Sequence, residues 1–265
     1  NMFCECQNFN QPLNNWNVSN VLGMGDMFAN CDIFNQQLNE WDVSNVEDMS
    51  WMLKGCDDFN QPLDKWDVSN VVNMYGIVQE CINFNQNINN WDVSNVEIMD
   101  YMFYGCENFN QPLNNWNVSN VKTMNHMFLE CKKFNQSLNK WNVSNVITMQ
   151  HMFSECRNFN QAINTNKQNT KQPNEYIAWN VSNVNNMKGM FEACEKFNQP
   201  LNNWDVSNVT NMKDIFWNCH IFNQPLNKWN VSNVTNIHGM FYECTKFNQP
   251  IGNWDVSNVV DMSHM

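Results

Sequence analysis

The sequence predicts a curved α/β solenoid, because one 25-residue pattern recurs about ten times along the chain. Tryptophan marks the copies, at Trp16, Trp41, Trp66, Trp91, Trp116, Trp141, Trp179, Trp204, Trp229 and Trp254. A cysteine recurs in a second phase, at Cys6, Cys31, Cys56, Cys81, Cys106, Cys131, Cys156, Cys194, Cys219 and Cys244. A fixed period of roughly 20–50 residues is typical of solenoids, propellers and arrays. We therefore expect each copy to be one unit that stacks on its neighbours.

Apolar residues follow the tryptophan of each copy with helical spacing. In the second copy they lie at Val46, Met49, Met52, Leu53 and Cys56. Offsets of three and four residues place such side chains on one face of a helix, and Ser44 stands where an N-cap belongs. The pattern V-x-x-M-x-x-M-F-x-x-C therefore predicts a short helix in each copy. A helix of about ten residues is unstable alone, so packing must stabilise it.

The residues around the tryptophan have the alternation of a half-buried strand. Leu38, Trp41 and Val43 fit the pattern L-x-x-W-x-V, which predicts a short parallel strand in each copy. Parallel strands lie about 4.8 Å apart, whereas helices need about 8–10 Å between axes. We therefore expect the strands on the concave face and the helices on the convex face. An all-strand β-helix is the alternative, which the spacing of the Met and Phe residues disfavours.

One insertion interrupts the period. Trp141 and Trp179 are 38 residues apart, which leaves 13 extra residues at 165–177, T-N-K-Q-N-T-K-Q-P-N-E-Y-I. The segment is polar, so we expect a loop that projects from one edge of the stack. The whole chain, residues 1–265, is interpreted as a single repeat domain that contains this inserted loop. Because the two ends fall at nearly the same phase of the repeat, the chain is expected to be a fragment of a longer array.

Composition argues against several classes of function. The net charge of −12 and the pI near 4.7 are the opposite of what phosphate-backbone binding requires, so no nucleic acid partner is expected. The sequence contains no run of about 20 apolar residues, so no membrane span is expected in this fragment. Three stacked aspartates, Asp42, Asp67 and Asp92, lack the cleft and the acid/base asymmetry of a catalytic carboxylate pair. Weak binding of a cation such as Ca²⁺ by these three aspartates remains an alternative, because oxygen ligands suit that ion. We expect no enzyme activity, no cofactor and no metal centre.

The cysteines are expected to be structural. Ten of the eleven share one position on the apolar face of the predicted helix, where small core residues belong. We therefore expect a column of buried free thiols. Disulfides or a metal remain the alternative, because a chain with many cysteines is often oxidised when secreted.

The repeat resembles a known family. The pattern M-F-x-x-C-x-x-F-N-Q-P-L-N-x-W-D-V-S-N-V-T-x-M is similar to the BspA-like leucine-rich repeat of bacterial surface proteins, in the variant common in mycoplasma lipoproteins and also found in protists and large DNA viruses. The resemblance covers essentially the whole chain. It implies a right-handed, leucine-rich-repeat-like solenoid and a role in surface display and adhesion. It brings no catalytic motif, and it implies a location at the cell surface or outside the cell, with the virion as the alternative.

Together these observations predict a non-enzymatic binding or adhesion module whose concave strand face contacts a protein or glycan ligand. The alternative is a structural spacer or shell component, on a cell surface or a virion, whose partners are neighbouring structural subunits. The predicted contact residues flank the tryptophans and point outward, at Asn15, Asn17, Glu40, Asp42, Lys65, Asp67, Asn90, Asp92, Asn115, Asn117, Lys140, Asn142, Asn203, Asp205, Lys228, Asn230, Asn253 and Asp255.

Overall fold

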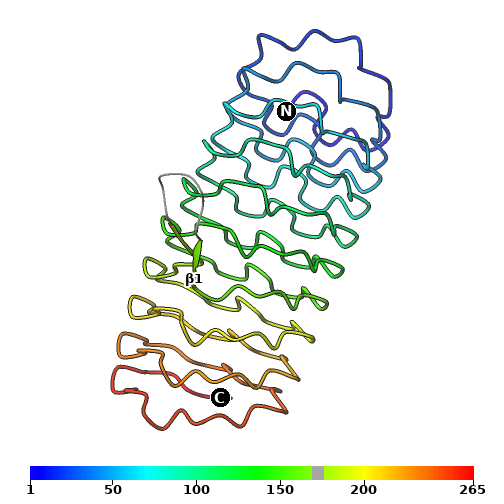
Figure 1. Cartoon of the computed structure of the whole chain (residues 1–265). Coiled ribbons are helices and arrows are strands. Elements are labelled where there is room, and N and C mark those ends of the chain that lie inside the picture. The colour runs from blue at the N-terminus through cyan, green and yellow to red at the C-terminus, as the bar shows by residue number, and fades with distance from the viewer. Residues whose placement is uncertain (169–175) are drawn as a thin grey trace.

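The computed structural model describes residues 1–168 and 176–265, in which each copy of the repeat forms one coil of the chain. The coils stack in chain order from the N-terminus to the C-terminus (Figure 1). One parallel bridge joins each coil to the next, as between Gly23 and Asp48 and between Asp48 and Asn73. Within the described residues the only strands are β1 (Asn166–Gln168) and β2 (Tyr176–Ala178).

The predicted α/β solenoid is wrong, since the described residues contain no helix and a single two-stranded sheet. Turns replace the helix predicted after the tryptophan. The N–H groups of Met52, Lys54 and Cys56 donate to the carbonyl oxygens three residues earlier, at 3.2, 3.1 and 3.1 Å. The N–H groups between them donate to carbonyl oxygens of the next coil at 2.7–3.0 Å, and they belong to Met49, Trp51, Leu53 and Gly55. We call residues 49–56 and their equivalents the turn segment.

Two left-handed residues in each turn segment prevent a helix. In the second coil they are Trp51, with φ at 53°, and Gly55, with φ at 65°. Left-handed residues cannot continue a right-handed helix. Stacked helices would also need about 8–10 Å per coil, whereas the phenylalanine rings of adjacent turn segments lie 5.4–5.9 Å apart. The turn segment fits this short spacing because half of its N–H groups bond across coils.

The predicted strand around the tryptophan is also replaced by turns. The N–H of Trp41 donates to the carbonyl oxygen of Leu38 at 3.0 Å, and that of Val46 to Val43 at 2.9 Å. Side-chain donors make the bonds between coils here. The Trp41 indole Nε1 donates to the Leu13 carbonyl oxygen at 3.0 Å, and equivalent indole bonds recur along the stack. Neither the leucine-rich-repeat strand nor the β-helix alternative therefore describes this part of the coil.

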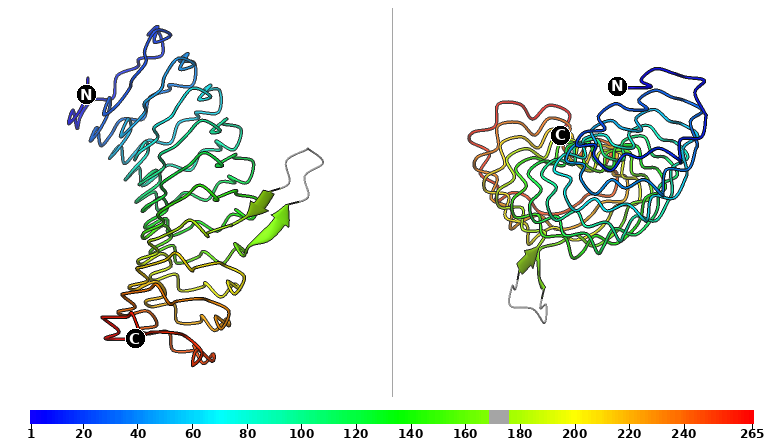
Figure 2. Two further views of the ribbon diagram at one scale, coloured as in Figure 1. Left: turned by 90° about the vertical axis from the view of Figure 1, so that its left-hand side faces the viewer. Right: turned by 90° about the horizontal axis from the view of Figure 1, so that it is seen from above.

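The stack bends in the direction opposite to the prediction. Neighbouring tryptophan rings lie 6.1–6.5 Å apart, farther than the phenylalanine rings of the turn segments. The tryptophan side is therefore the longer one, and the turn segments lie on the concave side. Both views of Figure 2 agree, because the β1–β2 hairpin beside the tryptophans projects from the convex side of the bend.

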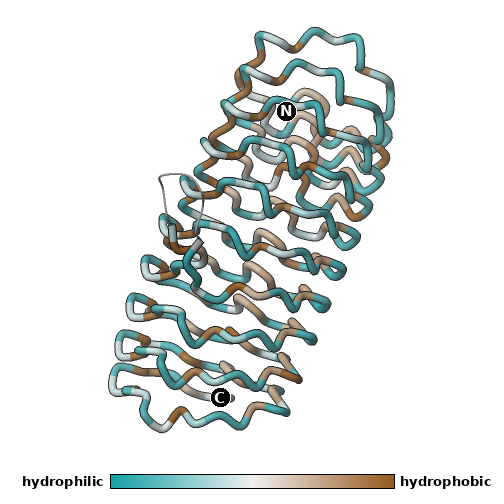
Figure 3. Tube along the Cα trace, in the orientation of Figure 1, coloured by the Kyte–Doolittle hydropathy of each residue, from teal (hydrophilic) through white to brown (hydrophobic). Residues whose placement is uncertain are grey.

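Columns of identical residues fill the interior, as the sequence predicts. Polar and apolar residues alternate around each coil (Figure 3). Leu, Trp, Val, Met, Phe and Cys of successive copies are buried, and most side chains in the central coils have no exposed surface. Nine of the cysteines belong to this core, while Cys6 in the first coil is exposed and Cys4 is half-buried; all eleven thiols are free.

The insertion forms a hairpin at its two ends. β1 pairs with β2 in antiparallel register, with Asn166 opposite Ala178 and Gln168 opposite Tyr176. The Thr165 hydroxyl donates to the Trp179 carbonyl oxygen at 2.9 Å, and the Trp179 N–H donates to the Trp141 carbonyl oxygen at 3.0 Å. These bonds attach the base of the hairpin to the stack. Residues 169–175 of the expected loop lie outside the described residues.

Candidate functional site: an acidic groove

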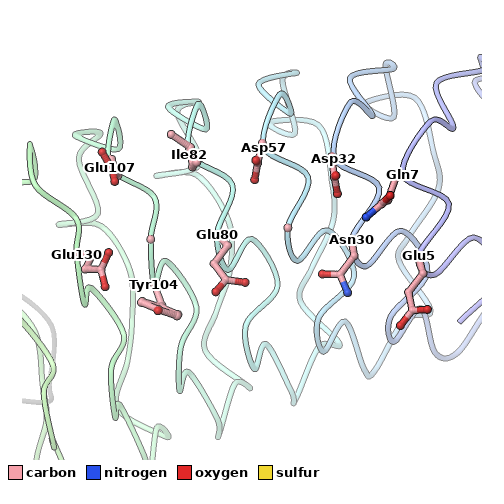
Figure 4. A pocket seen from close by; sticks show the side chains of 12 residues that line it. Glu5, Gln7, Asn30, Asp32, Asp57, Glu80, Ile82, Tyr104, Glu107 and Glu130 are labelled. Atoms are coloured by element: carbon pink, nitrogen blue, oxygen red, sulfur yellow. The ribbon is translucent and has the colours of Figure 1, made fainter.

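A groove with a volume of about 760 Å³ crosses six successive coils between residues 5 and 130. Two rows of side chains form its sides (Figure 4). One row contains Gln7, Asp32, Asp57, Ile82 and Glu107, and the other contains Glu5, Asn30, Glu80, Tyr104 and Glu130. Six of these ten residues are acidic, so the groove presents a line of carboxylates to the solvent.

Four of the five residues in the second row stand on left-handed backbone positions, and the fifth, Tyr104, directly precedes one. Glu5, Glu80 and Glu130 have φ values of 64°, 61° and 62°, and Gly55 and Gly105 occupy the same position in the coils between them. Glycine adopts this conformation at no steric cost, whereas a residue with a Cβ atom is disfavoured there by about 1–2 kcal/mol. Glutamate is therefore present at these positions despite the local preference for glycine or asparagine.

Each residue of the first row directly follows the repeat cysteine of its coil, which is buried in all of these coils except the first. In the second coil the Phe34 N–H donates to the Cys31 carbonyl oxygen at 2.9 Å, which closes a turn over Asp32. The cysteine and phenylalanine are buried on either side. The residue after the cysteine therefore points away from the core. Because every coil repeats this turn, Asp32 and Asp57 line up one above the other.

Burial and neighbouring carboxylates raise the pKa values of two acidic residues in the groove, Asp57 and Glu130. Burial raises the pKa of Asp57 above its ordinary value, and repulsion from Asp32, Asp58 and Glu80 raises it further. Burial also raises the pKa of Glu130, and repulsion from Glu155 adds to the effect. The Tyr104 hydroxyl has a raised pKa for the same two kinds of reason. These shifts indicate that negative charge accumulates in the groove.

One of the six carboxylates pairs with a cation inside the described part of the chain. Glu107 Oε1 lies 2.5 Å from Lys132 Nζ in the next coil. At the same end of the groove, Arg157 lies 3.4 Å from Glu155 and 3.7 Å from Glu195. Basic residues therefore mark one end of the acidic groove, and among the described residues no cationic side chain forms an ion pair with the groove carboxylates between residues 5 and 80.

This groove was not predicted from the sequence. The signal was present, because Asp32, Asp57 and Glu107 share one phase of the repeat and Glu5, Glu80 and Glu130 share another. A helix would have separated the two phases, and only the turn segment brings them to the two sides of one groove.

The predicted contact residues lie elsewhere, on the convex side beside the tryptophans. All eighteen are exposed except Asn142, which is half-buried. Lys65 pairs with Glu40 at 2.5 Å across adjacent coils. None of the eighteen lines the acidic groove. The predicted concave strand face is therefore wrong in its geometry, although the same residues do form a continuous exposed surface.

One column of this surface has a structural role. The Oδ1 atom of Asp42 accepts hydrogen bonds from the Ser44 N–H at 3.2 Å and the Ser44 hydroxyl at 2.6 Å. Asn117 accepts the equivalent bond from the Ser119 N–H at 3.2 Å. Aspartate and asparagine both provide this acceptor, which explains why the two residues alternate in the column. Among the described residues, no three His, Cys, Asp or Glu side chains are grouped so that they could hold a metal ion.

Asparagine and glutamine of the recurring Phe-Asn-Gln sequence form a second structural ladder. The Asn35 N–H donates to Asn10 Oδ1 at 3.0 Å, and Gln36 Nε2 donates to the same oxygen at 2.8 Å. The bonds recur in later coils. Each asparagine therefore satisfies a backbone donor of the next coil.

The fold and the groove together define a repeat protein with a charged surface that spans many copies. The chain belongs to the family described as "Mycoplasma protein of unknown function, DUF285", whose model matches residues 1–86, 60–167 and 164–265. No curated protein and no solved structure matches the chain. In the described part of the structure, no helix is long and apolar enough to cross a membrane.

Proposed function

We propose that this chain is a non-enzymatic binding module of a surface-displayed, BspA-like protein, and that its acidic groove takes an extended basic segment of a partner protein. The observation that carries the proposal is the line of carboxylates across six coils, most of them without a cation beside them. The location at the cell surface or outside the cell rests on the sequence resemblance.

The dimensions of the groove suit an extended peptide. The phenylalanine rings of adjacent turn segments lie 5.4–5.9 Å apart. The five steps between six coils therefore give a groove of roughly 28 Å, which is the length of about eight residues in an extended conformation. Lysine or arginine side chains of such a peptide would replace the repulsion among Asp57, Glu80 and their neighbours with attraction. Ile82 and Tyr104 provide apolar contact for the aliphatic parts of those side chains.

A labelled hexalysine peptide tests the proposal. We expect saturable binding at low ionic strength that weakens as salt rises, because salt screens exposed charges. Neutralising three groove residues in the variant Asp57→Asn/Glu80→Gln/Glu107→Gln should weaken binding at least tenfold. Fluorescence anisotropy titrations would measure the change.

The matched control removes the same charge from the convex side, in the variant Glu40→Gln/Asp67→Asn/Asp92→Asn. Binding should change little, because these residues lie outside the groove. Equal losses from the two variants would mean that the peptide responds to net charge alone, which would overturn the groove as the site. No binding by the parent chain would favour the alternative function, a structural spacer or shell component whose partners are neighbouring subunits.

A further inference from the structure

The inserted hairpin builds a second pocket on the other side of the stack. The pocket has a volume of about 480 Å³ and is lined by Asn114, Asn115, Trp116, Asn117, Ser119, Lys140, Asn142 and Tyr176. Tyr176 belongs to β2, and the Tyr176 hydroxyl donates to the Lys140 carbonyl oxygen at 2.6 Å. The hairpin therefore contacts the coil that precedes it and forms one wall of the pocket. The other copies that the structure describes have no hairpin beside the tryptophan.

The regular bonding between coils is interrupted at this pocket. The Oδ1 atoms of Asn39, Asn89 and Asn202 each accept a backbone N–H from the next coil, at 3.0, 3.0 and 2.9 Å. The equivalent atom, Asn114 Oδ1, is buried and has no hydrogen-bond partner among the described residues. An unpaired buried acceptor is unfavourable by about 1–3 kcal/mol. A donor that entered the pocket would relieve this cost.

The wall of the pocket has a composition of its own. It contains asparagine amides, which both donate and accept hydrogen bonds, together with a serine hydroxyl, one ammonium group and the ring of Tyr176. It contains no carboxylate, in contrast to the acidic groove. A cavity of this volume with a few polar groups around an aromatic ring lies within the size range of small-molecule sites.

We propose that this pocket binds a saccharide of one or two rings. Sugar hydroxyl groups donate and accept, so they match the amides of Asn117 and Asn142 and the unpaired oxygen of Asn114. The apolar face of a sugar ring can pack on Tyr176, which combines an apolar ring with a polar tip. The proposal concerns a different surface from the acidic groove and does not depend on peptide binding there.

The test uses the whole 265-residue chain and a panel of glucose, galactose, N-acetylglucosamine, N-acetylgalactosamine, sialic acid and lactose. Saturation-transfer NMR would identify a binder, and calorimetry would measure its affinity. The variant Asn117→Asp/Asn142→Asp keeps the Oδ1 acceptor that each turn needs but removes the two amide donors. It should fold normally, because aspartate occupies this position in other copies, and it should weaken binding at least tenfold.

The control variant, Asn17→Asp/Asn230→Asp, makes the same exchange in coils away from the hairpin and should leave saccharide binding unchanged. Hexalysine binding should be equal in the two variants, because neither pair of exchanged residues lines the acidic groove. This readout therefore distinguishes the saccharide pocket from the groove. The proposal is overturned if no sugar in the panel saturates the chain at tens of millimolar. It is also overturned if both variants lose binding equally, or if a neutral peptide competes with the sugar as well as free sugar does.

Discussion

The indole Nε1 of Trp116 donates a hydrogen bond to the carbonyl oxygen of Ile88 in the preceding coil, at 3.0 Å. Trp116 is 3% exposed and stacks between Trp91 and Trp141 at ring-centroid distances of 6.4 Å. The residue therefore joins three coils by ring contacts and by a bond from a side-chain donor, on the side of the stack where backbone bonds between coils are scarce.

We expect Trp116→Ala to lower the free energy of unfolding by about 3–5 kcal/mol, as large core truncations do. Trp116→Phe keeps a ring but leaves the Ile88 carbonyl oxygen without its partner, so we expect a loss of about 1–3 kcal/mol. Urea unfolding would measure both variants. Asn115→Ser, at the exposed neighbouring position, is the control and should stay within about 0.5 kcal/mol of the parent. An unchanged Trp116→Ala variant would contradict the buried tryptophan column.

The buried thiols make stability depend on pH at alkaline values. Burial raises the pKa of Cys31 to about 11 and that of Cys244 to about 12, and it raises the pKa of Cys131 well above its ordinary value. In the unfolded chain the thiols ionise near pH 8.5. The unfolded state therefore releases protons at a pH where the folded state retains them. Stability is fully present below about pH 8 and falls as the pH rises towards the folded-state pKa values, by about 1.4 kcal/mol per pH unit for each buried thiol.

Cys131→Ala isolates the contribution of one thiol. The variant should reduce the slope of unfolding free energy against pH, between about pH 9 and 10.5, by about 1.4 kcal/mol per pH unit. Urea titrations in the presence of a reductant would measure the slope. Cys6→Ala removes an exposed thiol and serves as the control, with no expected change in slope. If the two variants gave the same slope, burial would not be the cause.

At the left-handed positions of the acidic groove, a glutamate provides negative charge but lowers the stability of the fold. Glu80 has a φ of 61°, so Glu80→Gly should stabilise the chain by about 1–2 kcal/mol while it weakens hexalysine binding. Gly105 has a φ of 73°, and a Cβ atom there would lie 3.2 Å from the Glu80 Cα atom. Gly105→Ala should therefore destabilise by about 1–2 kcal/mol. Thermal unfolding would measure the change in stability of each variant. A loss of stability in Glu80→Gly would contradict the inference that the backbone at Glu80 is strained.

The asparagine ladder offers a test of side-chain bonding between coils. Asn110 Oδ1 accepts from the Asn135 N–H at 2.9 Å and from Gln136 Nε2 at 3.1 Å. Asn110→Ala leaves a backbone donor unpaired, so we expect a loss of about 1–3 kcal/mol in unfolding free energy. Asn110→Asp keeps an acceptor for both donors and should lose less. Urea unfolding distinguishes the two, and an aspartate variant as unstable as the alanine variant would exclude the acceptor role.

Part of the fold and little of the candidate site could be predicted from the sequence. The interior columns followed from the period, because residues that recur every 25 positions must meet when the copies stack. The structural role of Asp42 and its equivalents was not predicted, because the bond from the Ser44 N–H to Asp42 Oδ1 depends on the turn that only the tertiary structure shows. The groove was missed, since the residues on its two sides belong to different phases of the repeat.

The sequence by itself determined the period, the composition of the core and the position of the one insertion. Only the tertiary structure decided the path of the backbone within a coil. Apolar residues three and four apart suit a helix and a run of turns equally, and the choice depends on where the N–H groups find acceptors. Tryptophan and phenylalanine columns hold adjacent coils about 6 Å apart. That distance is too short for stacked helices, so the N–H groups of Met49 and its equivalents bond to the next coil instead.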